Sequence, residues 1–261
     1  MGGIGFDRVV DVYDATRSLP PPLMERAIAV LADVIGGDGP VLEVGVGTGR
    51  FAAPLRARGI RIVGVDIAAK MLARAREKGC EDLVLGTVTR LPFRDGAFRA
   101  SLAIHVLHLV AAWRDALREL ARVTRGPFLT VLETITTRAL DSEEAHAGAG
   151  PGDAYHPSRR YLEIARTRGF EYEHPGVRPP EMIARVPPDL RIPLGRHGEH
   201  VSGEALLAPA GTKSYSFQWN VPDDLHAAVM EQLTREMAGR TFERAWEIEV
   251  LGWSAAALRG F

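Results

Sequence analysis

The chain of 261 residues has one cysteine, Cys80, and only three lysines. A single cysteine excludes an intrachain disulfide bond and any zinc or iron–sulfur site built from several cysteines. This composition fits a reducing setting best, so we expect a cytoplasmic protein. Of the 32 basic residues, the three lysines leave 29 arginines. Because these are scattered along the chain, they indicate a GC-rich genome more than a phosphate-binding surface.

The chain also lacks an apolar run of about 18 residues, the length that a membrane-spanning helix needs. Its first twelve residues carry Asp7, Arg8 and Asp11 and show no apolar core of signal-peptide type. Acidic and basic residues nearly cancel, at 33 against 32, so a generally basic surface for nucleic acid is not supported. With 46% apolar and 25% charged residues, the composition is that of a soluble globular protein.

Up to about residue 135, short apolar runs alternate with amphipathic stretches. The spacing of Leu23, Ala27 and Leu31 is typical of a helix, whereas the run PVLEVGV is typical of a buried strand. Such alternation with short links predicts a parallel sheet covered by helices on both faces, with ligands at the carboxyl ends of the strands. The expected strands are 40–46, 61–65, 82–85, 98–107 and 128–134, and the expected helices are 22–35, 50–58, 68–78 and 113–123.

From about residue 138 the pattern changes, and ten of the 17 prolines lie between Pro151 and Pro222. We interpret residues 138–222 as an inserted lid and acceptor-binding segment. Residues 223–261 would complete the sheet with a helix and a strand, all within one domain over 1–261. In this part we expect a helix at 156–168, extended segments within 190–207, a helix at 225–237 and a late strand at 242–253.

The most informative segment is VLEVGVGTGR at residues 41–50, where an apolar strand runs into Gly45, Gly47 and Gly49. Glycine at alternate positions lets the backbone turn sharply and lets a ligand approach it closely. The helix that follows offers its N-terminal N–H groups at the same place. A dinucleotide loop of the form GxGxxG is not met from Gly45, and from Gly47 its last position is Ala52, so binding of NAD is weakened but not excluded.

An acidic residue follows the second expected strand. Asp66 lies seventeen residues after Gly49, and a carboxylate at this place can accept hydrogen bonds from both hydroxyls of a ribose. The alternative is a buried acid with a purely structural role. Together with the glycine loop, the spacing favours a nucleoside ligand.

These residues closely resemble the class I methyltransferases that use S-adenosylmethionine, in the branch with the LPF motif that is labelled methyltransferase type 11. Residues 41–50 and VGVDIAAKML at 63–72 resemble that family's glycine loop and ribose-binding segment. GTVTRLPFRDGAFRASLAIHVLHLV at 86–110 and WRDALRELARVTRGPFLTVLET at 113–134 resemble the stretches around its fourth and fifth strands. The resemblance covers roughly residues 8–135, the expected cofactor-binding core.

The resemblance implies a fold and a set of contacts with S-adenosylmethionine. The fold is a Rossmann-like, doubly wound α/β sheet of seven mostly parallel strands with an antiparallel last strand, plus the proline-rich lid. The glycine loop would pass beneath the amino-acid part of the cofactor, Asp66 would hold the ribose, and Ile67 would pack on adenine. His105 would lie near the methionine portion, mainly through its backbone, and Tyr13 would close over the cofactor. The expected cofactor-binding residues are Tyr13, Glu43, Gly45, Val46, Gly47, Thr48, Gly49, Asp66, Ile67, Met71, Thr87, Val88 and His105.

The sequence departs from the family pattern at the adenine end. Thr87 and Val88 would flank the adenine where the family usually has an aspartate before the LPF segment, and this chain reads Gly86-Thr87-Val88. The hydroxyl of Thr87 replaces a charge-assisted hydrogen bond, which weakens binding by roughly 1 kcal/mol. The family's Phe-Asp pair at the fourth strand is Phe98-Arg99 here, and we expect a shifted salt-bridge pattern from it.

Methyl transfer from a sulfonium is an in-line displacement that depends mainly on positioning and the exclusion of water. A general base is needed only where the acceptor must lose a proton. His108, in the segment HVLH, is our candidate for a catalytic residue that faces the acceptor. The alternative is that His108 only packs the turn after the fourth strand.

Two further polar clusters have a less specific pattern. The HGEH segment at 197–200 contains Gly198, which favours a turn over a metal-binding helix, so we expect no metal site. Arg159 and Arg160 open the expected helix after the fifth strand, where family members often contact the acceptor. An anionic acceptor held by these arginines is one hypothesis, and a solvated helix face is the other.

The sequence therefore predicts a methyltransferase that uses S-adenosylmethionine and acts on a small-molecule acceptor, with neither a membrane nor a nucleic acid as partner. Two alternatives stay open. A cofactor-binding protein that does not catalyse is favoured by the acid missing at Thr87, and a NAD-dependent oxidoreductase is favoured by the glycine loop. The acceptor atom and the oligomeric state do not follow from the sequence.

Overall fold

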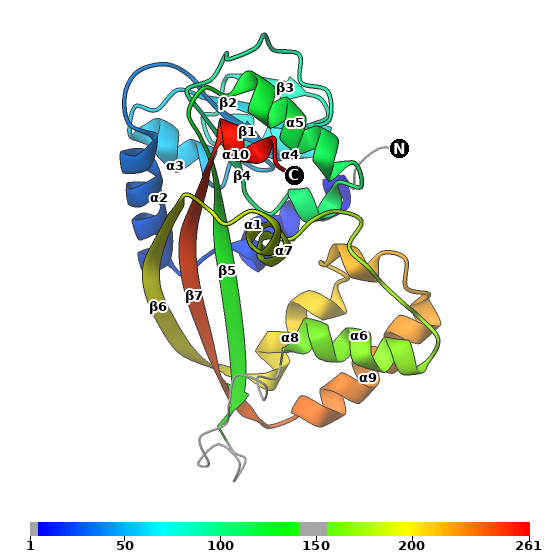
Figure 1. Ribbon diagram of the computed structural model, residues 1–261. Coiled ribbons are helices and arrows are strands. Elements are labelled where there is room, and N and C mark those ends of the chain that lie inside the picture. The colour runs from blue at the N-terminus through cyan, green and yellow to red at the C-terminus, as the bar shows by residue number, and fades with distance from the viewer. Residues whose placement is uncertain (1–4, 141–155) are drawn as a thin grey trace. The chain divides into compact units, whose positions relative to one another are not determined.

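The computed structural model describes residues 5–140 and 156–261, and these form two compact units. The first unit comprises Met1–Leu132, His174–Gly195 and Ile248–Phe261, and the second comprises Glu133–Glu173 and Arg196–Glu247. The strands are β1 (Val41–Val44), β2 (Ile62–Asp66), β3 (Leu83–Leu85), β4 (Ala100–Ala103), β5 (Pro127–Ala139), β6 (Leu190–Ser202) and β7 (Thr241–Ser254) (Figure 1). The α-helices are α1 (Val10–Arg17), α2 (Pro21–Ile35), α3 (Ala52–Ala57), α4 (Ala69–Glu77), α5 (Trp113–Val123), α6 (Pro157–Thr167), α7 (Pro179–Arg185), α8 (Gly203–Gly211), α9 (Asp223–Met237) and α10 (Ala255–Leu258), and the short 3₁₀ helices are η1 (Asp7–Val9), η2 (Leu107–Leu109) and η4 (Ser216–Gln218).

One sheet of seven strands has the order β3-β2-β1-β4-β5-β7-β6. The pairs β1–β2, β1–β4, β2–β3 and β4–β5 are all parallel. The last strand of the chain, β7, runs antiparallel to β5 (Figure 1). The predicted mostly parallel, doubly wound sheet with an antiparallel last strand is therefore confirmed. Its strand order reverses beside β1, and in such sheets the carboxyl ends at that point form a crevice for ligands.

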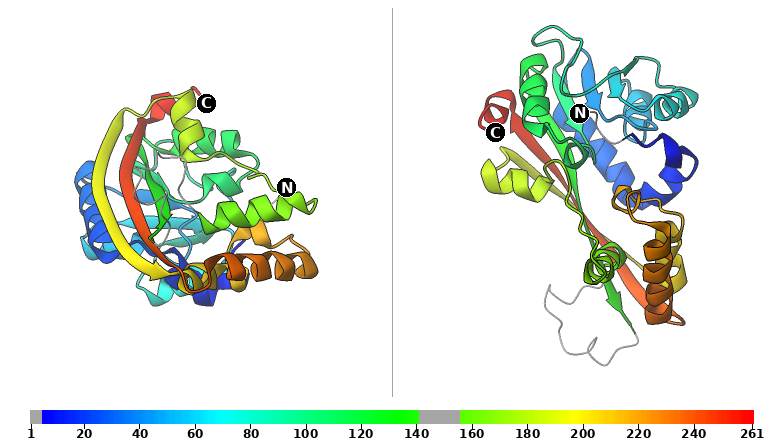
Figure 2. Two further views of the ribbon diagram at one scale, coloured as in Figure 1. Left: turned by 90° about the horizontal axis from the view of Figure 1, so that it is seen from below. Right: turned by 90° about the vertical axis from the view of Figure 1, so that its right-hand side faces the viewer.

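Helices cover both faces of the sheet in the first unit. The helices α3 and α4 lie on one face, and α5 and α10 lie on the other (Figure 2). Helix α5 turns Trp113, Leu117 and Leu120 into the core, as its spacing predicted. The strands β1 and β4 are buried along their whole length, which explains why small and apolar residues dominate them, with Glu43 as the one charged residue.

Two strand boundaries differ from the predicted ones by more than two residues. The fourth strand, expected to reach residue 107, ends at Ala103. His105 has a left-handed φ of 56°, and the chain then enters the 3₁₀ turn η2. The fifth strand, expected to end at residue 134, continues to Ala139.

The second unit has a core of its own, formed by the helices α6, α8 and α9. Val229, Leu233 and Met237 are buried along one side of α9, as their spacing predicted. Within this core the hydroxyl of Tyr161 lies 2.7 Å from Nδ1 of His226 in a buried hydrogen bond. Each of β5, β6 and β7 contributes residues to both units.

The role of residues 138–222 as a lid stays a prediction, as do the single-domain boundaries. His174–Gly195 belongs to the first unit, and residues 141–155 lie outside the described part of the chain. Within residues 5–140 and 156–261, no helix combines the length and the apolar character needed to cross a bilayer.

Candidate functional site

The glycine loop follows β1, and its three glycines all have positive φ angles, of 64° at Gly45, 56° at Gly47 and 75° at Gly49. A Cβ at Gly45 would lie 2.5 Å from the side chain of Val106, and one at Gly49 would lie 2.9 Å from Sγ of Cys80. At Gly47 the nearest atom would be 3.9 Å away. Two of the glycines are therefore required by internal packing as well as by φ, whereas Gly47 leaves its backbone open to a ligand.

The carboxylate of Asp66, at the end of β2, joins this loop to the neighbouring strand. Oδ2 of Asp66 accepts a hydrogen bond of 2.9 Å from the amide of Gly47, and Oδ1 accepts one of 2.9 Å from the amide of Ala68. Burial raises the pKa of Asp66, and these backbone hydrogen bonds oppose the rise. Because a carboxylate accepts about four hydrogen bonds, Asp66 keeps acceptor capacity for a ligand.

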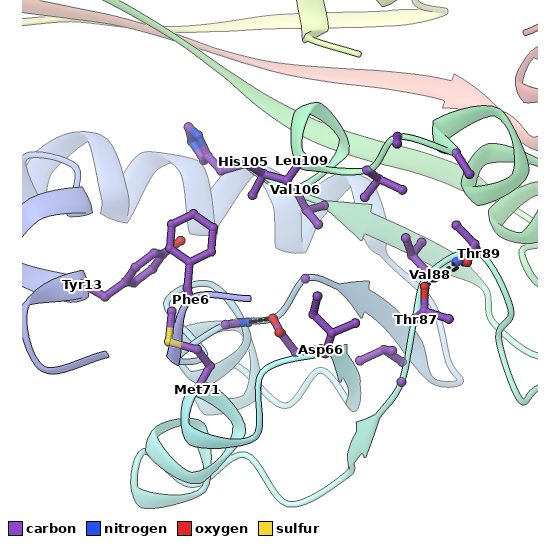
Figure 3. Close-up of a pocket in the computed structure, with 18 residues that line it drawn as sticks. Phe6, Tyr13, Asp66, Met71, Thr87, Val88, Thr89, His105, Val106 and Leu109 are labelled. Atoms are coloured by element: carbon purple, nitrogen blue, oxygen red, sulfur yellow. Dashed lines mark hydrogen bonds between the residues drawn. The ribbon is translucent and has the colours of Figure 1, made fainter. Parts of the chain in front are cut away.

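A pocket opens above the loop and the carboxyl ends of the strands. It holds about 780 Å³ of space when counted out to open solvent. Asp66 lies between Phe6, Tyr13 and His105 on one side and Thr87 and Thr89 on the other (Figure 3). The lining residues are Phe6, Tyr13, Gly45, Gly47, Val65, Asp66, Ile67, Met71, Gly86, Thr87, Val88, Thr89, His105, Val106, Leu109, Val110, Ala111 and Ala112.

Nine of the predicted site residues are therefore brought together in this pocket: Tyr13, Gly45, Gly47, Asp66, Ile67, Met71, Thr87, Val88 and His105. Four predicted cofactor residues lie just outside its lining. The side chain of Val46 is buried, and Gly49 packs on Cys80. Thr48 donates to Oδ1 of Asp14 at 2.6 Å. Glu43 is buried in β1 with no hydrogen-bond partner at Oε2 among the described residues, and burial raises its pKa to about 8.

Sequence reasoning missed half of the lining. The residues Leu109 to Ala112 follow the turn at His105, which the longer predicted strand concealed. Phe6 meets the ring of Tyr13 edge-on, with 5.7 Å between the ring centroids. For Thr89 a signal was available, because it lies two residues after Thr87 in the segment already matched to the adenine side.

The residues of helix α1 are at most half-buried, and polar contacts hold it beside the loop. Its Asp14 accepts from Thr48 and also pairs with Lys78, just after α4. Asp11 pairs with Arg74 at 3.2 Å. Burial raises the pKa of Tyr13, which therefore keeps its proton and faces the pocket as a neutral phenol.

A segment far along the chain fixes the turn that follows β4. The amide of Gly176 donates to the carbonyl of His108 at 3.0 Å, and that of Val177 donates to the carbonyl of Leu107 at 3.2 Å. The contact is so close that a Cβ at Gly176 would lie 1.9 Å from the Leu107 oxygen. Residues near 176 thus support the wall formed by Leu109 and the residues after it.

His108 lies outside the pocket lining, with its ring edge-on to that of His174 at 5.1 Å between centroids. Burial lowers the pKa of His108 to about 3, and the nearby His174 and His105 add to this effect. The ring is therefore neutral at physiological pH and is a weak base. Whether it faces an acceptor stays a prediction.

The arginines of α6 are engaged with carboxylates of the second unit. Arg159 pairs with Glu163 at 3.1 Å, and Arg160 makes a two-pronged contact with Glu236 at 3.0 and 2.8 Å. An anion would have to compete with these carboxylates. In the HGEH segment, Glu199 pairs with Arg244.

Comparison with known proteins finds a match within the first unit. Residues 42–126 match the family model described as "Methyltransferase domain". Over these residues the chain is similar to methyltransferases. The match spans the glycine loop, Asp66, the Thr87 segment and the turn after β4, which together carry most of the pocket.

Two curated relatives are similar to this chain in sequence over about half of its length. The malonyl-[acyl-carrier protein] O-methyltransferase of Serratia marcescens is 30% identical over 136 residues, covering 52% of this chain and 52% of the relative. The demethylmenaquinone methyltransferase of Mycobacterium marinum is 38% identical over 136 residues, covering 50% of this chain and 58% of the relative. The chain thus spans about half the length of the curated relatives it matches.

Solved structures show the fold over nearly the whole chain. A protein assigned as a type II methyltransferase from Anaeromyxobacter dehalogenans has a TM-score of 0.57 at 19% identity, covering 88% of this chain and 96% of its own. One assigned as a methyltransferase from Bacillus halodurans has a TM-score of 0.54 at 16% identity, covering 90% and 99%. At these identities the likeness concerns the fold alone.

The residues present fit S-adenosylmethionine, the cofactor that the resemblance implies. Asp66 offers a carboxylate inside the pocket, and Gly47 allows a close approach of a ligand to the backbone. The walls at Ile67, Met71 and Val88 are apolar, as a purine requires.

Proposed function

We propose that the protein transfers a methyl group from S-adenosylmethionine to a small-molecule acceptor. The observation that supports this most is the single pocket in which the Asp66 carboxylate and the open backbone of Gly47 lie 2.9 Å apart. When bound, the cofactor supplies an activated methyl group on a sulfonium. The family match over residues 42–126 supports that chemistry.

The pocket residues would then divide the binding work along its length. Asp66 would accept from the ribose hydroxyls, and the Gly45–Gly49 loop would lie beneath the amino-acid part. Tyr13 and His105 would enclose the methionine end. Ile67, Val88 and Met71 would surround the adenine with apolar contacts.

Catalysis would rest on positioning and not on proton transfer by the protein. His108, the candidate residue facing the acceptor, is a weak base because its pKa lies near 3. It would act as a neutral hydrogen-bonding group. In-line displacement needs mainly the correct alignment of acceptor and methyl group and a site that excludes water.

A small-molecule acceptor is supported by the chain's balanced charge and by the name of one relative, which is named for demethylmenaquinone. Another relative is named for malonyl-[acyl-carrier protein], whose malonyl group is carried on a protein. These substrates belong to those proteins. For the present chain we propose only the class, because the pairing of Arg159 and Arg160 with carboxylates gives no support to an anionic acceptor.

The test separates transfer from mere binding. Calorimetry with S-adenosylhomocysteine measures cofactor binding, and a screen with a labelled methyl group measures transfer to candidate acceptors. We expect binding and transfer. Binding without transfer across the screen would support the alternative of a non-catalytic cofactor-binding protein, and saturable binding of NADH would support the oxidoreductase.

A further inference from the structure

The end of the pocket beyond Asp66 carries two hydroxyl groups where the family pattern has a carboxylate. Oγ1 of Thr87 and Oγ1 of Thr89 lie 2.9 Å apart, and the amide of Thr89 donates to Oγ1 of Thr87 at 3.3 Å (Figure 3). Both side chains line the pocket. This pair is the polar group that would meet the edge of the purine when Asp66 holds the ribose of the same ligand.

The hydrogen atoms of the pair can be counted. Two hydroxyls carry two hydrogens, and one of these lies between the oxygens in the contact of 2.9 Å. The other is free to turn, and oxygen lone pairs remain as acceptors. The pair can therefore accept from an amino group or donate to an oxygen. A carboxylate in the same place can only accept.

The rest of this end adds no charge that would favour one purine over another. Its other side chains are apolar, and Asp66 is the only carboxylate among the lining residues. Thr87 is exposed, and Thr89 is half-buried. Room therefore remains for a substituent slightly larger than an amino group.

We propose that the Thr87–Thr89 pair lowers the selectivity of this site for a hydrogen-bond donor at position 6 of the purine. The site would then bind cofactors that carry either a hydrogen-bond donor or an acceptor at that position. The inference rests on the proposed function, since it concerns the base of the same cofactor. It makes Thr87 and Thr89 specificity-determining residues. The site then recognises the cofactor mainly by binding its ribose and amino-acid parts.

The test compares S-adenosylhomocysteine with an analogue in which a 6-methoxy group replaces the 6-amino group. This analogue keeps ring nitrogen N1 as an acceptor, so only the substituent changes from donor to acceptor. Calorimetry gives the ratio of the two dissociation constants. We expect the parent protein to discriminate by less than about 5-fold, because its hydroxyls can serve both ligands.

The matched variants are Thr87→Asp and Thr87→Asn, which have the same shape. The aspartate should raise the ratio to about 20 or more, because its oxygens have no hydrogen to donate to the methoxy oxygen. The asparagine amide can donate and accept, and it should keep the parent's ratio. Thermal unfolding of each variant checks that it is folded.

Each result decides the proposal. A parent ratio above about 5, or an aspartate variant that discriminates no better than the asparagine variant, overturns it. The parent measurement stands alone if a variant does not fold. A parent that binds neither ligand instead refutes the proposed function, and the two failures are thus distinguishable.

Discussion

The two units of this protein differ in the elements that build them and in how much of their chemistry follows from local sequence. In the first, a few residues at strand ends form a candidate ligand site: three glycines in the five positions after β1 and one carboxylate at the end of β2. In the second, helices pack around a buried Tyr161–His226 pair, with arginines held by carboxylates. The comparison teaches that the cofactor pocket depends on short motifs, whereas the helical unit depends on contacts between distant residues. The family match ends at residue 126, so it covers the short motifs of the first unit and none of the helical unit.

The largest effect is expected at the glycine loop. Gly45→Ala combines a φ of 64° with a Cβ placed 2.5 Å from Val106, and it should lower the free energy of unfolding by about 3 kcal/mol. Gly59→Ala is the matched control, because its φ is 82° and nothing lies within 4 Å. The control should lose only about 1 kcal/mol. Urea unfolding measures both, and equal losses would contradict the packing argument.

The next effect concerns the carboxylate that links loop and ligand. Asp66→Ala should weaken the binding of S-adenosylhomocysteine by about 100-fold, because ribose hydroxyls lose their acceptor and the Gly47 amide loses its partner. Asp82→Ala, which removes a surface pair with Arg61, is the control and should bind as the parent does. Calorimetry decides, and an unchanged affinity in Asp66→Ala would refute the cofactor assignment.

Because of the turn after β4, the stability of the first unit should depend on pH. The His108 ring is kept neutral by burial, with a pKa of about 3, whereas in the unfolded chain it is protonated below about 6.5. As pH falls from 6.5, the unfolded state binds a proton that the folded state does not, so stability is lost, by about 2 kcal/mol down to pH 5.

His108→Asn should remove this part of the loss of stability at low pH, as urea unfolding at pH 7 and pH 5 would measure. Burial also lowers the pKa of His174, so a smaller loss of the same sign should remain. An acid loss as large as that of the parent would show that His108 is not buried as described.

The smallest effect is expected in the second unit. Tyr161→Phe removes the hydroxyl that bonds to His226 and should lower stability by about 1 kcal/mol. The affinity for S-adenosylhomocysteine should not change, because the lining residues all lie in the first unit. A weakened affinity would mean that the two units are not separable in the way the comparison supposes.

The fold and half of the pocket follow from the sequence because the signals are local. The glycine loop, Asp66 and the Thr87 segment each sit within a few residues of a strand end, and periodicity places those ends. The wall after β4 was missed because His105 takes a left-handed φ that non-glycine residues rarely adopt, so the apolar run reads as a longer strand. The support from Gly176 was also missed, because neither segment carries a local sequence signal for a contact across almost 70 positions.

That contact limits how far the recognisable segment can be moved into another protein. A fragment cut at residue 126 would retain the segment that matches the family model but would lose the amides of Gly176 and Val177, leaving the carbonyls of His108 and Leu107 to water. A transplant or truncation that aims to carry the pocket must therefore include the segment around residue 176, because a chimaera joined between the two would keep the matched segment without these two hydrogen bonds.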